Sequence, residues 1–350
     1  MGNGGIAVVK QHEQEGFAER VRVKQETLAL DLEKQFGLWF LELLAVALCA
    51  IPAGAQPFAY VPNHQSNNVS VIDTARNMVV ATIPGVAGGP EGDAITPDGA
   101  FAYVTNSISN TVTVIDTSTN TVVTSVTVGL NPKAIAVSAD GAFAYTANLS
   151  GNSITVIDTS TNTVVTSVTV GLSPKAIAVS ADGAFVYAGN INSNSVSVVD
   201  TTSKMVVHTI PVGPNPRGAA LTPDGAFLYV ATTGSDQVYV IDTSNDQVVA
   251  IVQVGVFPAN LAFTPDGAFA YVANSGSNNV SVIDTSSNTV VATVPVGISP
   301  FTDAVTPDGA FVYVANIGTN NVSVIDTSTN MTVATIPVGA EPLGMAITPF

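Results

Sequence analysis

Cysteine, tryptophan and positive charge are scarce in this sequence of 350 residues. The single cysteine, Cys49, and the single tryptophan, Trp39, both precede residue 56, so the rest of the chain has no disulfide, thiolate metal site or cysteine nucleophile. Lysine and arginine number 10 against 26 acidic residues, which gives a net charge of −16. Such a surface repels a phosphate backbone, so we expect no nucleic-acid partner.

Histidine is also rare. Only His64 and His208 follow residue 56, and two dispersed histidines cannot build a multi-histidine copper site. The sequence contains no Cys-x-x-Cys-His haem-attachment motif, and no Gly-x-Ser-x-Gly nucleophile elbow stands out. We therefore expect no cofactor and no metal, and no motif designates a catalytic residue.

The N-terminal region contains an apolar run at residues 38–51, followed by Pro52 and the small residues Ala53-Gly54-Ala55. This pattern is typical of a secretory signal peptide cleaved before Gln56. An uncleaved membrane anchor is the alternative, but Glu42 inside the run makes spanning costly. We expect residues 1–55 to be an N-terminal extension with a signal peptide or anchor, and the protein to be secreted, periplasmic or at the cell surface.

Internal repeats dominate the rest of the chain. An Ile-Asp or Val-Asp pair recurs with one spacing of 43 residues and then five of 42, at Asp73, Asp116, Asp158, Asp200, Asp242, Asp284 and Asp326. Residues 115–130 and 157–172 are identical, which indicates recent internal duplication. A period of 40 to 45 residues with four strands per unit is the signature of a β-propeller.

One unit illustrates the four strands. Segments 134–138, 143–148, 153–158 and 163–170 are rich in Val, Ile, Thr and aromatic residues, as strands prefer. An Ala-Asp-Gly turn at 139–141 separates the first two, because glycine readily takes positive φ there. The unit therefore reads as a four-stranded antiparallel blade.

The two ends of the chain predict how the ring closes. The first unit begins at Phe58 and lacks an innermost strand, whereas the chain ends with an isolated strand at 345–348. Joining the two completes a blade and removes an unpaired edge. We predict an all-β fold over residues 56–350: a seven-bladed β-propeller of four-stranded antiparallel blades, closed by the C-terminal strand joining the N-terminal blade.

An aromatic pair recurs in every unit. A phenylalanine precedes a tyrosine by two residues, so the two side chains share one strand face. The pairs begin at Phe58, Phe101, Phe143, Phe185, Phe227, Phe269 and Phe311. Because all seven units carry it, we interpret the pair as inter-blade core rather than a ligand platform.

The repeats also resemble a known family. Residues 103–106 read Tyr-Val-Thr-Asn, and Tyr-Val-Ala-Asn recurs at 271–274 and 313–316. With the TPDGA and VSVIDT segments, residues 57–350 resemble the YVTN-family β-propeller repeats, although Thr232 replaces the expected asparagine. The resemblance implies an exported or surface-layer-like protein with a binding or structural role, and it implies no catalytic residues.

The few basic residues suggest a site. Lys133, Lys175 and Arg217 occupy one repeat position, directly after the proline that precedes the innermost strand, in consecutive blades. That position should ring one mouth of the central channel. Other blades place apolar or acidic residues nearby, which predicts a mouth divided into cationic, apolar and acidic arcs. The candidate ligand-binding residues are Glu91, Asp93, Lys133, Lys175, Arg217, Phe301, Asp303 and Leu343.

Three functions are compatible with these features. We favour a non-catalytic, monomeric exported scaffold that binds protein or glycan at the cell surface, with a small anionic ligand at the mouth. The first alternative is a hydrolase similar to the lactonase-type seven-bladed propellers, with Glu91, Lys133 and Arg217 as the acid and base candidates. The second is a periplasmic accessory to a redox or metal system, which the scarcity of His, Cys and Trp argues against.

Overall fold

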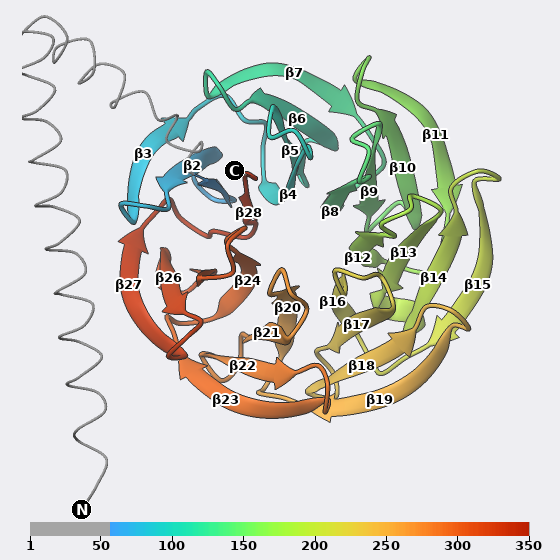
Figure 1. The fold of residues 1–350 in the computed structure, drawn as a ribbon. Coiled ribbons are helices and arrows are strands. Elements are labelled where there is room, and N and C mark those ends of the chain that lie inside the picture. The colour runs from blue at the N-terminus through green and yellow to red at the C-terminus, as the bar shows by residue number, and fades with distance from the viewer. Residues whose placement is uncertain (1–56, 350) are drawn as a thin grey trace, which may run out of the picture. The chain divides into compact units, whose positions relative to one another are not determined.

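The structure is a computed structural model that describes residues 57–349. It confirms the predicted fold: seven four-stranded antiparallel sheets are arranged in a ring, with one strand of each at the centre and one at the rim (Figure 1). The predicted signal peptide and the boundary at residue 55 lie outside the described residues. Within residues 57–349, no helix is long and apolar enough to cross a membrane.

The strands take four repeating places in the blades. The innermost strands are β28 (Ala346–Ile347), β4 (Pro90–Ile95), β8 (Pro132–Val137), β12 (Pro174–Val179), β16 (Pro216–Leu221), β20 (Pro258–Phe263) and β24 (Pro300–Val305). The second strands are β1 (Phe58–Asn63), β5 (Phe101–Asn106), β9 (Phe143–Asn148), β13 (Phe185–Asn190), β17 (Phe227–Thr232), β21 (Phe269–Asn274) and β25 (Phe311–Asn316).

The third strands are β2 (Asn68–Asp73), β6 (Thr111–Asp116), β10 (Ser153–Asp158), β14 (Ser195–Asp200), β18 (Gln237–Asp242), β22 (Asn279–Asp284) and β26 (Asn321–Asp326). The rim strands are β3 (Met78–Ile83), β7 (Thr121–Thr127), β11 (Thr163–Thr169), β15 (Met205–Pro211), β19 (Gln247–Gln253), β23 (Thr289–Pro295) and β27 (Met331–Pro337). A single 3₁₀ turn, η1 (Ile191–Ser193), interrupts the all-β pattern of the described residues.

Closure occurs as predicted, through the C-terminal strand. β28 pairs antiparallel with β1, with Ala59 opposite Ile347. Thr348 reinforces this pairing, since its backbone N–H donates to the Phe58 carbonyl at 2.9 Å and its Oγ1 accepts from the Phe58 N–H at 2.8 Å. The regular strand is two residues long, shorter than the predicted 345–348, and it completes blade 1.

Burial follows the position of each strand in the blade. The second and third strands are buried on both faces between neighbouring blades, so they read as continuous Val, Ile, Ala and Tyr runs. Rim strands such as β7 expose most of their residues. The tyrosines of the aromatic pairs are at most 3% exposed, which confirms them as core. Five of their phenylalanines are partly buried and pack against this core, but Phe227 and Phe269 are 37% and 36% exposed, so the prediction is wrong at these two positions.

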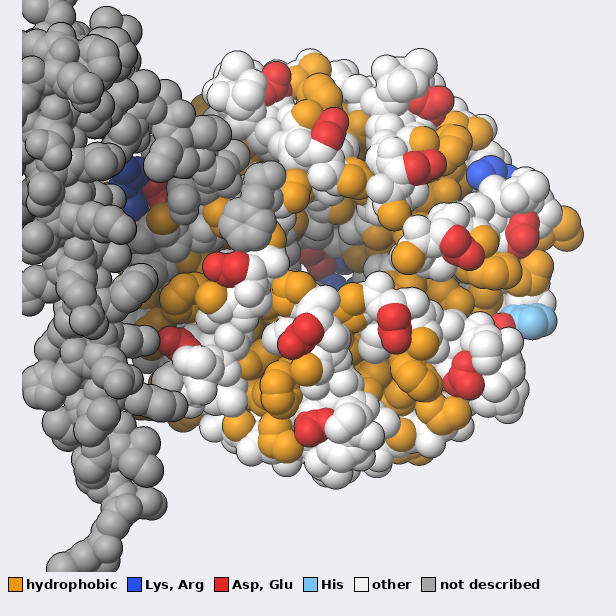
Figure 2. Space-filling view, viewed as in Figure 1, with side chains coloured by type: hydrophobic (Ala, Val, Ile, Leu, Met, Phe, Trp, Pro, Cys, Tyr) orange, Lys and Arg blue, Asp and Glu red, His pale blue; other side chains and the backbone are white. Residues whose placement is uncertain are grey.

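One face of the disc carries the acidic turns. The turns after the innermost strands and those after the third strands lie on this face, and Figure 2 shows their carboxylates spread across it. Each carboxylate satisfies its own turn: Asp116 Oδ1 accepts the N–H groups of Ser118 and Thr119, at 2.8 and 3.1 Å. These aspartates are turn-forming residues.

A hydrogen bond between neighbouring blades recurs next to these turns. The core tyrosine of one blade donates its hydroxyl to an asparagine, held at positive φ, in the next blade. The pairs are Tyr60–Asn120, Tyr103–Asn162, Tyr229–Asn288, Tyr271–Asn330 and Tyr313–Asn77. We call each of these a tyrosine latch. At the two remaining junctions the asparagine position holds Lys204 and Asp246.

Candidate functional site

The repeat position that holds Lys133, Lys175 and Arg217 lies on a β-bulge in the innermost strands of blades 2 to 7. In β8, Pro132 pairs with Asn148 and Ala134 with Ala147, so Lys133 between them has no partner. The same shift leaves Lys175 and Arg217 unpaired in β12 and β16. Bulges re-aim side chains beside functional sites, and here they turn this position toward the centre of the ring. Sequence spacing located the residues but not the bulge that orients them.

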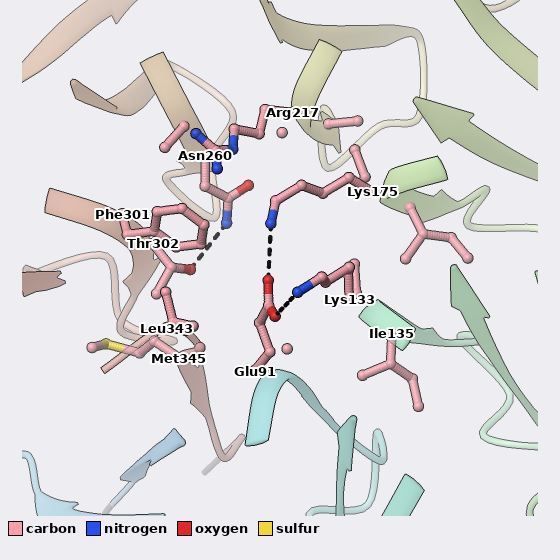
Figure 3. A pocket seen from close by; sticks show the side chains of 18 of the residues that line it. Glu91, Lys133, Ile135, Lys175, Arg217, Asn260, Phe301, Thr302, Leu343 and Met345 are labelled. Atoms are coloured by element: carbon pink, nitrogen blue, oxygen red, sulfur yellow. Dashed lines mark hydrogen bonds and ion pairs between the residues drawn. The ribbon is translucent and has the colours of Figure 1, made fainter. Parts of the chain in front are cut away.

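The residues at the bulges line a cavity of about 170 Å³. Seven of the eight predicted site residues line it, namely Glu91, Asp93, Lys133, Lys175, Arg217, Phe301 and Leu343. Figure 3 shows all of these except Asp93 as labelled side chains around the cavity. The eighth, Asp303, does not line it. The volume is below that of pockets for drug-sized ligands, so the cavity suits a small molecule.

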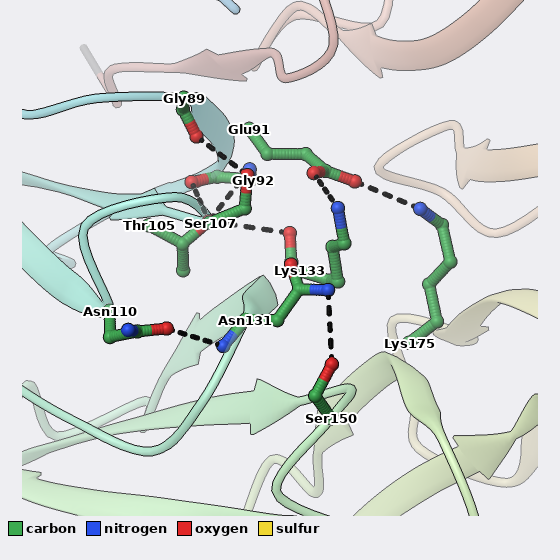
Figure 4. A network of polar contacts seen from close by, with 10 residues as sticks. All are labelled: Gly89, Glu91, Gly92, Thr105, Ser107, Asn110, Asn131, Lys133, Ser150 and Lys175. Atoms are coloured by element: carbon green, nitrogen blue, oxygen red, sulfur yellow. Dashed lines mark hydrogen bonds and ion pairs between the residues drawn. The ribbon is translucent and has the colours of Figure 1, made fainter.

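Glu91 bridges two of the cations. Its carboxylate accepts from Lys133 Nζ at 2.6 Å and from Lys175 Nζ at 2.8 Å (Figures 3 and 4). The predicted separation into cationic and acidic arcs is therefore wrong at Glu91. Glu91 lies in blade 2 (β4–β7), next to blade 3 (β8–β11), and its side chain reaches both lysines. Burial alone would raise the pKa of Glu91, but the two ammonium groups outweigh burial and lower it.

The backbone beside Glu91 is fixed by close packing between blades 2 and 3. Thr105 Oγ1 accepts the Gly92 N–H at 2.9 Å and lies 3.3 Å from the Lys133 carbonyl oxygen (Figure 4). A Cβ at Gly92 would lie 2.5 Å from the same carbonyl oxygen, so only glycine fits. This contact holds the Glu91 and Lys133 bulges side by side.

Lys175 and Arg217 share an aromatic neighbour. Lys175 Nζ lies 5.1 Å and the Arg217 guanidinium carbon 5.3 Å from the centre of the Phe301 ring. Burial lowers the pKa of Lys175; Glu91 opposes this shift, while Arg217 and Lys133 add to it. Arg217 Nε is buried and has no hydrogen-bond partner among residues 57–349. Among residues 57–349, the guanidinium is the cation of the cavity that forms no ion pair, and its donors are available to a ligand.

Two carboxyl groups occupy equivalent positions on either side of blade 1. Burial raises the pKa of both Asp93 and Asp303 well above the usual range of a carboxyl group. Asp93 lines the cavity and packs against Gly344, where a Cβ would lie 2.5 Å from Asp93 Oδ1. Both carboxylate oxygens of Asp303 are buried without a partner among the described residues.

Sequence analysis missed the residues that complete the cavity wall. Asn260, Thr302 and Met345 line it, and Asn260 Nδ2 donates to Thr302 Oγ1 at 3.0 Å. They lie one or two residues beyond the bulge position, and this offset in the repeat was the signal that could have found them. No group of three or more His, Cys, Asp or Glu side chains placed to hold a metal occurs in residues 57–349.

A family model matches most of this chain. The model of the family described as "Lactonase, 7-bladed beta-propeller" matches residues 53–165, 87–206 and 203–349. No curated protein shows a significant match to the sequence.

Solved structures share the fold. A chain of Kuenenia stuttgartiensis hydrazine synthase is 28% identical, with a TM-score of 0.70 over 77% of this chain and 92% of that one. A protein of unknown function from Desulfotomaculum acetoxidans has a TM-score of 0.74 at 18% identity, covering 83% and 99% of the two chains. A Bacteroides fragilis protein assigned as a 6-phosphogluconolactonase has a TM-score of 0.72 at 17% identity, covering 85% and 99%.

The family match corrects the favoured function. The sequence led us to expect a non-catalytic scaffold for protein or glycan, and that expectation is wrong. The matched family is one of lactonases, and the match extends over all seven blades. It favours the hydrolase that the sequence left as an alternative.

Proposed function

Because this chain belongs to the lactonase family of seven-bladed β-propellers, we propose that it is a lactone hydrolase whose active site is the cavity at the channel mouth. The cavity lies at the centre of the ring, where the innermost strands of all seven blades converge. It holds acid, base and cationic groups within a space suited to one small ring.

One observation carries the proposal: two carboxyl groups of the same cavity have pKa values shifted in opposite directions. Glu91 is held as a carboxylate by Lys175 and Lys133, whereas burial favours the neutral form of Asp93. The two are two residues apart in β4 and line the same space. Carboxyl groups whose environments separate their pKa values supply a base and an acid at one pH.

The hydrolysis follows from these roles. Glu91 takes a proton from a water molecule, whose oxygen attacks the lactone carbonyl carbon. The negative charge that develops on the carbonyl oxygen is stabilised by Lys133 and Arg217. Asp93 gives its proton to the ring oxygen as the ring carbon–oxygen bond breaks, and the product is a hydroxy acid. Transfer of the Glu91 proton back to Asp93 through solvent restores the starting state.

The charge of the cavity defines the substrate class we propose. Three basic side chains and one ionised carboxylate favour an anionic molecule, and Arg217 has donors to spare. The walls formed by Phe301 and Leu343 suit the carbon face of a ring. We therefore propose small lactones that carry a carboxylate or phosphate; the assignment of the Bacteroides fragilis protein as a 6-phosphogluconolactonase supports this choice.

The experiment compares three carboxyl variants on one panel of lactones. Glu91→Gln and Asp93→Asn should each lower kcat by about 100-fold or more, as loss of a general base or acid does. Asp303→Asn is the matched control, because Asp303 is buried and occupies the place in blade 7 that Asp93 occupies in blade 2, but does not line the cavity. Equal activity of all three variants would remove the site from the cavity.

We further propose that the protein is an exported YVTN-type repeat protein. The support is the apolar segment ending in Ala53-Gly54-Ala55, together with the Tyr-Val-Thr-Asn and Tyr-Val-Ala-Asn motifs. Mass spectrometry of the protein purified from its native cells should give an N-terminus at Gln56 in an extracytoplasmic fraction. Retention of residues 1–55 in a cytoplasmic fraction would contradict export.

A further inference from the structure

The cavity holds more positive than negative charge. Lys133, Lys175 and Arg217 share one ionised carboxylate, Glu91, since the neutral form is favoured at Asp93. Like charges that are poorly solvated disfavour protonation of one another. Arginine does not lose its proton in proteins, so the repulsion among the three cations favours loss of a proton from a lysine.

Lys175 is the lysine best placed to become neutral. Its side chain is 10% exposed, against 18% for Lys133, and it lies between Lys133 and Arg217 in blade order. Burial and the two flanking cations lower its pKa. A neutral amine still donates a hydrogen bond to Glu91 Oε1, so the 2.8 Å contact persists and leaves a nitrogen lone pair available.

Arg217 stands beside this amine. Both groups lie over the Phe301 ring, at 5.1 and 5.3 Å from its centre, and both line the same cavity (Figure 3). A guanidinium binds a carboxylate through two parallel hydrogen bonds. A small molecule whose carboxylate binds Arg217 would therefore hold its next carbon within the cavity that Lys175 also lines.

We propose that Lys175 is a nucleophilic amine that forms an imine with small carbonyl compounds carrying a carboxylate, such as 2-oxo acids. The amine lone pair attacks the carbonyl carbon and forms a carbon–nitrogen bond. Glu91 takes a proton from that nitrogen and delivers it to the former carbonyl oxygen, which becomes a hydroxyl group. Glu91 then transfers the second nitrogen proton to this hydroxyl, which leaves as water as the carbon–nitrogen double bond of the neutral imine forms. The reaction consumes one carbonyl compound and releases one water, with no oxidant or reductant. A lysine beside another cation is a recognised way to activate this chemistry.

The test traps the imine in the full chain. The protein is incubated at pH 7 with glyoxylate and cyanoborohydride, which reduces an imine to a stable amine, and peptides are mapped by mass spectrometry. We expect Lys175 to be labelled several-fold faster than Lys204, a lysine outside the cavity, because a glyoxylate carboxylate bound at Arg217 holds the aldehyde beside the Lys175 amine. Labelling of Lys175 no faster than Lys204 would overturn the proposal.

Two further arms test the carboxylate and separate this proposal from lactone hydrolysis. Acetaldehyde, which lacks the carboxylate, should label Lys175 several-fold more slowly than glyoxylate, and Arg217→Gln should remove that difference. The rate of Lys204 labelling serves as the control for general amine reactivity in each variant. Equal labelling by the two aldehydes in the unaltered chain would refute the role of Arg217. None of these readouts uses a lactone, so failure of the hydrolase proposal leaves the labelling result unaffected.

Discussion

The tyrosine latch that joins blade 7 to blade 1 offers a quantitative test of ring closure. Tyr313 is fully buried, and its hydroxyl donates to Asn77 Oδ1 and lies 3.0 Å from the Thr74 carbonyl oxygen. In Tyr313→Phe the ring still fills its place, but both acceptors lose their donor. A net hydrogen bond contributes about 1 kcal/mol and an unsatisfied buried acceptor costs about 1–3 kcal/mol, so we expect a loss of about 2 kcal/mol.

Tyr145→Phe is the control for that measurement. Tyr145 is equally buried in blade 3, but Lys204 stands where the latch asparagine would be, so its hydroxyl has no latch to lose. Urea unfolding and calorimetry should show a loss below about 0.5 kcal/mol for this variant. For Tyr313→Phe we expect Tm to fall by about 4 °C, at about 2 °C per kcal/mol for a body of this size. Equal losses in the two variants would refute the latch.

Three other perturbations follow from the same contacts. Lys204→Asn should raise the free energy of unfolding by about 1 kcal/mol, because asparagine tolerates the positive φ of 57° at this position and supplies the missing latch acceptor. An unchanged urea midpoint would contradict this prediction. Asp303→Asn should raise Tm at pH 7.5 and leave it unchanged at pH 4. Because burial raises the pKa of Asp303, its contribution to stability is complete below about pH 4 and declines as the pH rises toward the folded-state pKa. The opposite pH trend would exclude a buried neutral carboxyl group. Lys133→Met with Lys175→Met should cost about 3–5 kcal/mol by leaving Glu91 buried and unpaired, and adding Glu91→Gln should recover most of it in calorimetry.

The fold was predictable because the repeat imposes it. The 42-residue period, the Asp-Gly turns and the split first blade each correspond to a local rule, and β28 closing onto β1 followed from the chain ends alone. Phe227 and Phe269 were wrongly predicted to be buried because the alternation of side chains along a strand specifies which face a side chain takes, but not how far the neighbouring blade extends over it. Phe227 is the first residue of β17, next to the face with the acidic turns, where the neighbouring blade covers the side chain incompletely.

The site was predictable in position but not in its pairing. Because Lys133, Lys175 and Arg217 share one position of the 42-residue repeat, the sequence predicted that they lie on one ring, and in the structure they line one cavity. The bulge that turns them inward leaves no sequence signature beyond the preceding proline. Glu91 was predicted to lie in an opposing arc because only its charge was considered, and not the length of its side chain. The ion pairs form because neighbouring blades bring their bulges together.

Whether this protein hydrolyses lactones is tested most directly by assaying the unaltered chain. Proton release should be followed at constant pH for glucono-δ-lactone, its 6-phosphate and a carboxylated lactone, with the spontaneous rate subtracted. The account predicts catalysed ring opening that favours the anionic lactones, with kcat/KM falling in acid as Glu91 is protonated and in base as Asp93 ionises. Absence of catalysis on every lactone across that pH range would contradict it.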